Sequence, residues 1–65
     1  MTIGENIRFF RTQAGLTQAE LAEKVNTTQP AISDYEADRS SPNVKTADKI
    51  AAALGVTLND LMREG

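Results

Sequence analysis

The side chains that could support catalysis or bind a metal are carboxylates and hydroxyls, because the chain contains no histidine and no cysteine. Histidine is the usual general base near neutral pH and the commonest metal ligand, so Ser33 beside Asp34 has no base to activate it. No glycine-rich phosphate-binding loop is present. Asp34, Glu36 and Asp38 together could form a metal site, but we interpret them as a solvated helix face. The sequence predicts no enzyme, no metal and no cofactor.

Helix-start signals recur at short intervals along the chain. Thr2 precedes Glu5, and Thr17 precedes Glu20, by three positions, which is the capping-box pattern in which hydroxyl and carboxylate satisfy free backbone N–H groups. Thr57 and Asp60 repeat it. The five expected N-caps are Thr2, Thr17, Thr28, Asn43 and Thr57.

Helix ends and apolar spacing agree with these starts. Gly15, Asn26 and Gly55 are expected to adopt the left-handed conformation where the chain turns. Ile3, Ile7, Phe10 and Ala14 recur at helical spacing, and no segment alternates with a period of two. We therefore expect an all-α, compact five-helix fold. The helices are predicted at about 3–14, 18–25, 29–37, 44–54 and 58–63.

Length and composition limit the protein to one domain, residues 1–65. A chain this short buries only about 60% of its unfolded surface, so its stability margin is thin. No apolar run approaches the roughly 20 residues of a membrane span, and the N-terminus lacks the apolar core of a secretory signal. We expect an intracellular protein without membrane association.

The second and third predicted helices are joined by a very short turn, which forces the steep crossing of a helix-turn-helix at about 18–37. Their sequence, QAELAEKVNTTQPAISDYEA, resembles the lambdoid-phage repressor and Cro type of helix-turn-helix, the Xre family. Ala22 is the small residue where the two helices touch, and Val25 and Ile32 close the motif. RSSPNVKTADKIAAALGVTLNDLM resembles the family's fourth and fifth helices, so the resemblance extends from about Ile3 to Met62.

This resemblance implies a repressor-like domain that binds operator DNA as a transcriptional regulator, with its third helix in the major groove. It implies a homodimer on a palindromic operator, weak without DNA, and no small-molecule ligand. It also implies a bacterial or phage-encoded protein that acts in the cytoplasm. The Met1 start fits a complete small protein, and the head of a longer regulator would look the same.

Individual residues take roles from the same resemblance. Gln29 is the foremost candidate for base contact, because glutamine can pair with adenine through two hydrogen bonds. The expected base-reading residues are Gln29, Pro30, Ala31, Ser33 and Asp34. The expected phosphate contacts are Gln18, Thr28, Arg39, Asn43 and Lys45. Arg11 and Glu36 match a family pair that forms a structural ion pair, and Tyr35 is expected to pack in the core.

Charge weighs against a nucleic-acid partner, since such proteins are usually basic and this chain has a net charge of −2. Residues 17–38 hold five acids and one base, a net of −4, whereas residues 39–55 hold three bases and one acid, a net of +2. Phosphate contacts are therefore expected on the loop after the third helix and at the start of the fourth. Asp34 departs from the family pattern, since the reading helix more often carries a basic or amide residue at this position. A carboxylate in the groove can accept a hydrogen bond from cytosine, but phosphates repel it.

Two further hypotheses concern protein partners. The fifth helix is too short to bury all its apolar residues, so Leu58 and Met62, four positions apart, are predicted to line the dimer contact. Phe9 is expected to be a partly exposed edge of the core. The alternative function is a protein-interaction module of the same fold, an antitoxin or anti-repressor target, with weak or no DNA binding.

Overall fold

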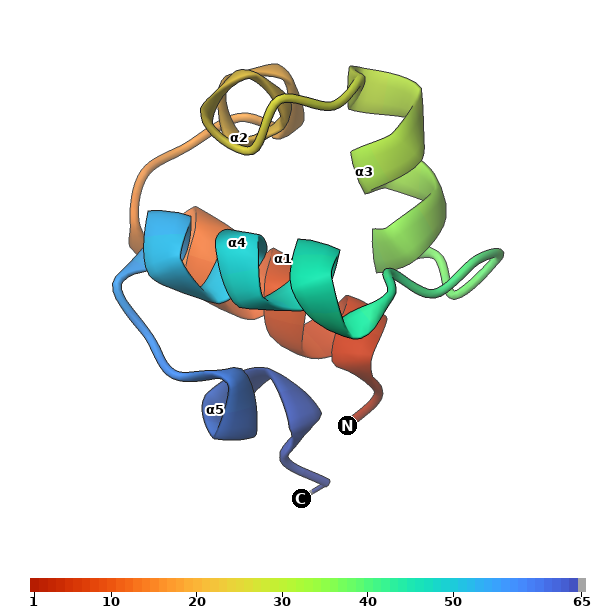
Figure 1. Cartoon of the computed structure of the whole chain (residues 1–65), viewed down its shortest axis with the longest axis vertical. Coiled ribbons are helices and arrows are strands. Elements are labelled where there is room, and N and C mark those ends of the chain that lie inside the picture. Colours follow the sequence, from red (N-terminus) through yellow and green to blue (C-terminus); the bar gives the residue numbers. More distant parts are fainter. Residues whose placement is uncertain (65) are drawn as a thin grey trace.

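Five helices joined by short loops make up residues 1–64, which are the residues that this computed structural model describes (Figure 1). They are α1 (Ile3–Gln13), α2 (Gln18–Lys24), α3 (Gln29–Glu36), α4 (Val44–Leu54) and α5 (Leu58–Met62). The expected all-α architecture is confirmed, and each helix boundary agrees with the prediction to within one residue. The small differences lie at helix ends, where Ala14, for example, keeps a helical φ of −79° as the C-cap of α1.

All five helix starts are capped as the sequence predicted. Thr2, Thr17 and Thr57 form complete capping boxes, and Thr28 and Asn43 each accept a hydrogen bond from a backbone N–H of the first turn. Hydrogen bonds from the backbone and hydroxyl of Thr17 lower the pKa of Glu20, and those from Thr57 lower the pKa of Asp60 in the same way. Both contributions to stability are present at neutral pH and are lost as the pH falls through the lowered pKa values.

Three turns adopt the left-handed backbone that their residues favour. Gly15 and Gly55 have φ of 73°, and Asn26 has φ of 59°. Asp38, also at φ 59°, reverses the chain after α3, and the sequence analysis did not anticipate it. The turn at Asp38 brings the backbone N–H of Arg39 to 2.9 Å from the carbonyl oxygen of Asp34.

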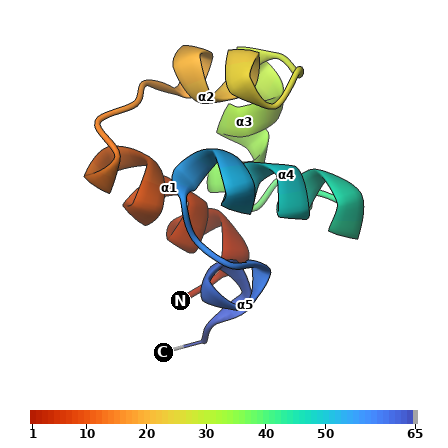
Figure 2. The ribbon, with the colours of Figure 1, turned by 60° about the vertical axis from the view of Figure 1, so that its left-hand side comes forward.

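The helices α2 and α3 cross steeply at one end of the molecule. Figure 1 views α2 nearly end-on and α3 from the side, and Figure 2 shows the short connection between them. The long helices α1 and α4 lie below this pair, and α5 lies at the opposite end, near both termini. None of the helices within residues 1–64 combines the length and the apolar character needed to cross a bilayer.

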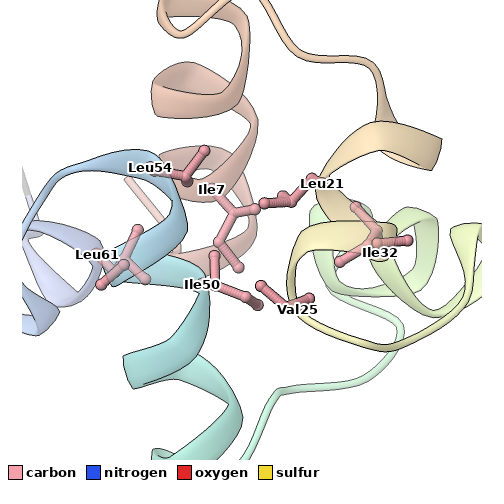
Figure 3. Packing of buried hydrophobic residues seen from close by; sticks show 9 residues of the cluster. Ile7, Leu21, Val25, Ile32, Ile50, Leu54 and Leu61 are labelled. Carbon is pink, nitrogen blue, oxygen red and sulfur yellow. The ribbon is translucent and has the colours of Figure 1, made fainter.

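The core joins one buried side chain or more from every helix (Figure 3). Its largest fully buried members are Ile7, Leu21, Ile32, Ile50 and Leu61. Tyr35 packs against this cluster, as expected for a packing residue. Ala14, which continues the helical spacing of Ile3, Ile7 and Phe10, does not pack on the core, because it is the exposed C-cap residue after the end of α1. A methyl group is too small to require burial at a helix end.

Gly4 allows α1 to approach the end of α3 more closely than any other residue would. A Cβ atom at this position would lie 2.2 Å from the backbone oxygen of Tyr35 and 2.7 Å from Oδ1 of Asp38. The hydroxyl of Thr2 donates to Oδ2 of Asp38 at 2.8 Å, which holds the same two segments together. The sequence contains no local signal for this contact, since the residues are more than 30 positions apart.

Asn6 is a buried polar residue of α1, at 5% exposure. Its Nδ2 donates to the carbonyl oxygens of Leu61 at 2.8 Å and of Arg63 at 2.7 Å. These carbonyls belong to the last turn of α5 and the residue after it, where helical acceptors lack partners. A single amide on α1 thereby fastens the C-terminal helix.

We expect Gly4→Ala to lower the free energy of unfolding by about 2 kcal/mol or more, because the added methyl group meets backbone that cannot rotate away. Gly15→Ala is the matched control. No atom lies within 4 Å of its Cβ position, so it should lose only about 1 kcal/mol, through its positive φ. Urea unfolding of both variants measures the difference. A Gly4→Ala protein as stable as the parent would show that the two helices are not held this close.

Candidate nucleic-acid interface

Helix α3 presents one side to the core and the other to solvent. Ile32 is fully buried and Tyr35 packs on the core, whereas Gln29 and Pro30 in the first turn are exposed. The other expected base-reading residues, Ala31, Ser33 and Asp34, are half-buried. All five belong to this one helix. The outward side of α3 is thus short and leaves Gln29 and Pro30 exposed, with α2 alongside the first turn, where Gln29 contacts Gln18.

Arg11 and Glu36 form an ion pair between the last turns of α1 and α3. Nε of Arg11 lies 2.6 Å from Oε2 of Glu36, and the two side chains are only 12% and 4% exposed. A second guanidinium nitrogen donates to Oε1 of Glu36 at 3.1 Å, and the third donates to the carbonyl oxygen of Leu16 at 2.7 Å. All three guanidinium nitrogens are therefore engaged in holding the α1–α2 turn and α3 to α1.

Gln18 and Gln29 form a chain of hydrogen bonds that leads from this ion pair to the surface. Nε2 of Gln18 donates to Oε1 of Glu36 at 3.1 Å, and Nε2 of Gln29 donates to Oε1 of Gln18 at 2.7 Å. The direction of the chain follows from its origin, because an ionised carboxylate can only accept. Gln18 must therefore present its amide nitrogen to Glu36 and its oxygen to Gln29. This leaves Gln29 with its own oxygen and one N–H directed to no other side chain of residues 1–64.

The expected phosphate contacts lie on several elements: Gln18 begins α2, Thr28 caps α3, Arg39 follows the end of α3, and Asn43 and Lys45 lie at the start of α4. Thr28 accepts from the N–H of Ala31 at 3.3 Å and can still donate its own hydroxyl hydrogen. Asn43 accepts from the N–H of Thr46 through Oδ1 at 2.8 Å, so its Nδ2 remains a donor. Arg39 and Lys45 are exposed. These side chains supply donors and positive charge beside α3.

The three carboxylates that could have formed a metal site point to three different partners. Asp34 pairs with Arg39, with Oδ1 and Nη1 3.2 Å apart, and Glu36 pairs with Arg11. Asp38 accepts from Thr2. Within residues 1–64 no group of acidic side chains is arranged to hold a metal ion.

A shallow hollow of about 270 Å³ adjoins the ion pair and the outward side of α3. It is lined by Arg8, Arg11, Gln18, Ser33, Glu36 and Ala37. Arg8 is exposed and forms no ion pair with any residue of 1–64, so it leaves the hollow with a net positive charge. Arg8 was not among the residues expected from the sequence to contact DNA. Its spacing of three residues before Arg11 on α1 was the available signal, because such residues share a helix face.

A larger depression of about 550 Å³ lies between the end of α2 and α4. Its lining consists of Lys24, Val25, Asn26, Lys49, Ala52 and Ala53. These side chains offer neither a nucleophile with a base nor a carboxylate pair. The depression also lacks any residue of α3, so it is separate from the interface described above.

Helix α5 leaves part of its apolar surface uncovered. Met62 is 57% exposed and Leu58 is half-buried, whereas Leu61 between them is fully buried. Phe9 on α1 is 47% exposed, as expected for the edge of the core. The α5 surface lies at the end of the molecule opposite α2 (Figure 1).

The arrangement matches known helix-turn-helix proteins in sequence. A family model described as helix-turn-helix matches residues 7–61. The immunity repressor protein of Bacillus phage phi105 is 38% identical over 64 residues, which cover 98% of this chain and 44% of that protein. Multiprotein-bridging factor 1 of Debaryomyces hansenii is 43% identical over 58 residues, which cover 89% of this chain and 39% of that protein. The chain therefore spans less than half the length of either relative.

Solved structures share the same architecture. The P22 c2 repressor protein, crystallised in complex with synthetic operator 9T, superposes with a TM-score of 0.91 at 28% identity. The superposition covers 97% of this chain and 96% of the repressor chain. The five-helix arrangement is thus that of a repressor domain solved on DNA.

We expect the Arg11–Glu36 pair to show a coupling free energy well above 1 kcal/mol in a double-mutant cycle. Removing one partner of a buried pair strands the other charge and costs up to about 3–5 kcal/mol. Unfolding of Arg11→Ala, Glu36→Ala and the double variant measures the coupling. The exposed pair Asp34–Arg39 on the same helix end is the control, expected at about 0–1 kcal/mol. Equal couplings for the two pairs would contradict a clamping role for Arg11 and Glu36.

Proposed function

Because the chain belongs to the Xre-type helix-turn-helix family, we propose that it is a sequence-specific DNA-binding transcriptional regulator whose third helix enters the major groove of operator DNA. The operator-bound P22 c2 repressor shares its architecture, and the phi105 relative is an immunity repressor. Both support repression as the direction of control. The major groove accommodates a helix and presents a distinct donor and acceptor pattern for each base pair.

The hydrogen-bonded chain that ends at Gln29 is the observation that carries this proposal. Gln18 holds the Gln29 amide through one N–H at 2.7 Å, which orients the side chain at the first turn of α3. The remaining N–H can donate to N7 of adenine, and the oxygen can accept from the N6 amino group beside it. Fixing the side chain before binding reduces the conformational entropy lost on contact. Gln29 is therefore proposed to read adenine, with Pro30, Ala31 and Ser33 beside it.

Phosphate contacts are proposed around α3. Gln18 and Arg8 line the polar hollow, Thr28 is the N-cap of α3, and Asn43 and Lys45 lie at the start of α4. Such contacts set the position of the helix but carry no sequence information. Few of these residues are charged, so the affinity should fall only shallowly with salt.

We expect Gln29→Ala to cost about 1–3 kcal/mol on the preferred site and to relax preference at one base pair. Arg8→Ala is the comparison variant and should weaken binding about equally on all sequences, with a salt slope smaller by about 1. Fluorescence anisotropy on matched and mismatched duplexes at several salt concentrations separates the two patterns. Equal loss on every sequence for Gln29→Ala would assign Gln29 to phosphate contact instead.

Selection from random duplex DNA at low salt tests the proposed function as a whole. Enrichment of a palindrome is the expected result, since dimers of this motif bind two half-sites about one helical turn apart. Absence of any enriched sequence would overturn sequence-specific binding.

We also propose that the chain forms a homodimer through α5. Met62 and Leu58 offer an apolar stripe at the end of the molecule opposite α2. Two such short helices bury far less than the roughly 1,200 Å² of a stable interface, so the dimer is proposed to be weak without DNA.

We expect Met62→Glu to abolish cooperative binding to two half-sites while leaving binding to one half-site unchanged, because it places charge in the apolar contact. Asn59→Glu adds the same charge to an exposed position of α5 and serves as the control. Sedimentation with and without operator DNA gives the stoichiometry. If Met62→Glu assembles as cooperatively as the parent, the interface lies elsewhere.

A protein-interaction module is the second candidate function, and the likeness to multiprotein-bridging factor 1 favours it. The exposed acids Glu20 and Glu23 on α2 would then contribute a partner surface. Failure of the DNA selection, together with loss of partner capture on Glu23→Lys, would support this alternative.

A further inference from the structure

We propose that Asp34 and Arg39 act together as one specificity element that selects a C·G base pair. This inference rests on the proposed function, because it requires α3 to lie in the major groove. It assigns a role to the one acidic residue on the outward side of α3 that a DNA-binding helix would not be expected to carry.

The end of α3 builds the pair through its backbone. Asp38 adopts φ of 59°, and this reversal returns Arg39 over the last turn of the helix. The N–H of Arg39 donates to the carbonyl oxygen of Asp34 at 2.9 Å, and Nη1 of Arg39 lies 3.2 Å from Oδ1 of the same residue. The backbone hydrogen bond places Arg39 beside the last turn of α3, and the side-chain contact brings its guanidinium to the carboxylate of Asp34.

Both side chains remain accessible after pairing. Asp34 is 46% exposed and Arg39 is 70% exposed. Asp34 lies one turn beyond Pro30, on the same outward side of α3. Only Oδ1 of Asp34 and Nη1 of Arg39 are occupied, so Oδ2 remains an acceptor, and the other guanidinium nitrogens remain donors.

The chemistry of the unoccupied oxygen favours cytosine. An ionised carboxylate only accepts, and in the major groove cytosine presents the N4 amino group as a donor. Guanine and thymine present acceptor oxygens, which repel it. Adenine has an amino donor at N6 but also an acceptor at N7 beside it, so a carboxylate is less favourable there than the amide of an Asn or Gln.

Arg39 removes the penalty of bringing this carboxylate to DNA. The phosphates of the duplex repel an uncompensated anion, and the repulsion acts on every sequence. A guanidinium held against Asp34 cancels the charge and can direct its remaining N–H groups to a phosphate, which binds them in a planar fork. Arg39 is therefore a positioning residue for Asp34 as well as a phosphate contact.

The first test compares base preference in the parent and in Asp34→Asn. Selection followed by competition binding should give cytosine at one position of the parent site, with a loss of about 5- to 150-fold on replacing it. Asp34→Asn should change the preference at that position to adenine, because asparagine pairs with adenine through two hydrogen bonds. Preference at the Gln29 position should stay unchanged.

The second test uses Arg39→Gln on duplexes without the preferred site. Affinity should fall on all sequences, and adding Asp34→Asn to Arg39→Gln should restore several-fold of it, because the uncompensated carboxylate is gone. With Arg39 present, Asp34→Asn should change this non-specific affinity little. Arg63→Gln is the control, because Arg63 is 74% exposed, pairs loosely with Asp60 at 3.9 Å, and is the C-cap of α5, which lies at the end of the molecule opposite α2. It should leave DNA binding unchanged.

These outcomes separate the inference from the proposed function. If the parent selects no DNA sequence, the proposed function fails. If the parent selects a palindrome but Asp34→Asn leaves every base preference unchanged, DNA binding stands and the specificity element is overturned. If Asp34→Asn changes the affinity for duplexes without the preferred site equally in the presence and absence of Arg39, the joint action of the two residues is overturned. Circular dichroism of each variant confirms that the helices are intact.

Discussion

The ion pair between Arg11 and Glu36 is the contact on which the geometry of the interface depends. Glu36 receives hydrogen bonds from Arg11 and Gln18, and Arg11 also reaches the carbonyl oxygen of Leu16. The hydrogen bonds of Glu36 and Arg11 therefore connect α1, the turn before α2, α2 itself and α3. Because Gln18 in turn holds Gln29, the orientation of a surface amide is determined by a charge inside the molecule.

The same pairing explains how an acidic chain can present a surface suited to DNA. Two acids of the helix-turn-helix are paired with arginines outside the counted segment, Glu36 with Arg11 and Asp34 with Arg39, whereas Glu20 and Asp38 accept hydrogen bonds from threonines, which do not cancel a charge. Glu23 remains exposed on α2 without an ion pair to any residue of 1–64. The local count of −4 in the sequence thus overstates the charge that faces a duplex.

Local signals in the sequence predicted the helices well, because caps and helical periodicity act within a few residues. Thr17 with Glu20, or Thr28 before Pro30, requires no knowledge of distant contacts. Gly4, Asn6 and Asp38 could not be predicted in this way. Each acts through a partner more than 30 residues away, and a glycine inside a helix pattern or an asparagine on a mostly apolar face has no local meaning. Residue types and spacing identified the candidate residues of the interface. Only the fold shows which of these residues donates a hydrogen bond to which.

The hydrogen bonds that Asn6 donates to the carbonyl oxygens of Leu61 and Arg63 set the direction in which the chain leaves α5. That exit lies at the end of the molecule opposite α2, near the N-terminus. A fluorescent protein or a peptide tether attached at this exit would therefore extend away from the first turn of α3. Two copies joined head to tail through such tethers could occupy neighbouring half-sites at once, and the length and stiffness of the linker would set their effective concentration.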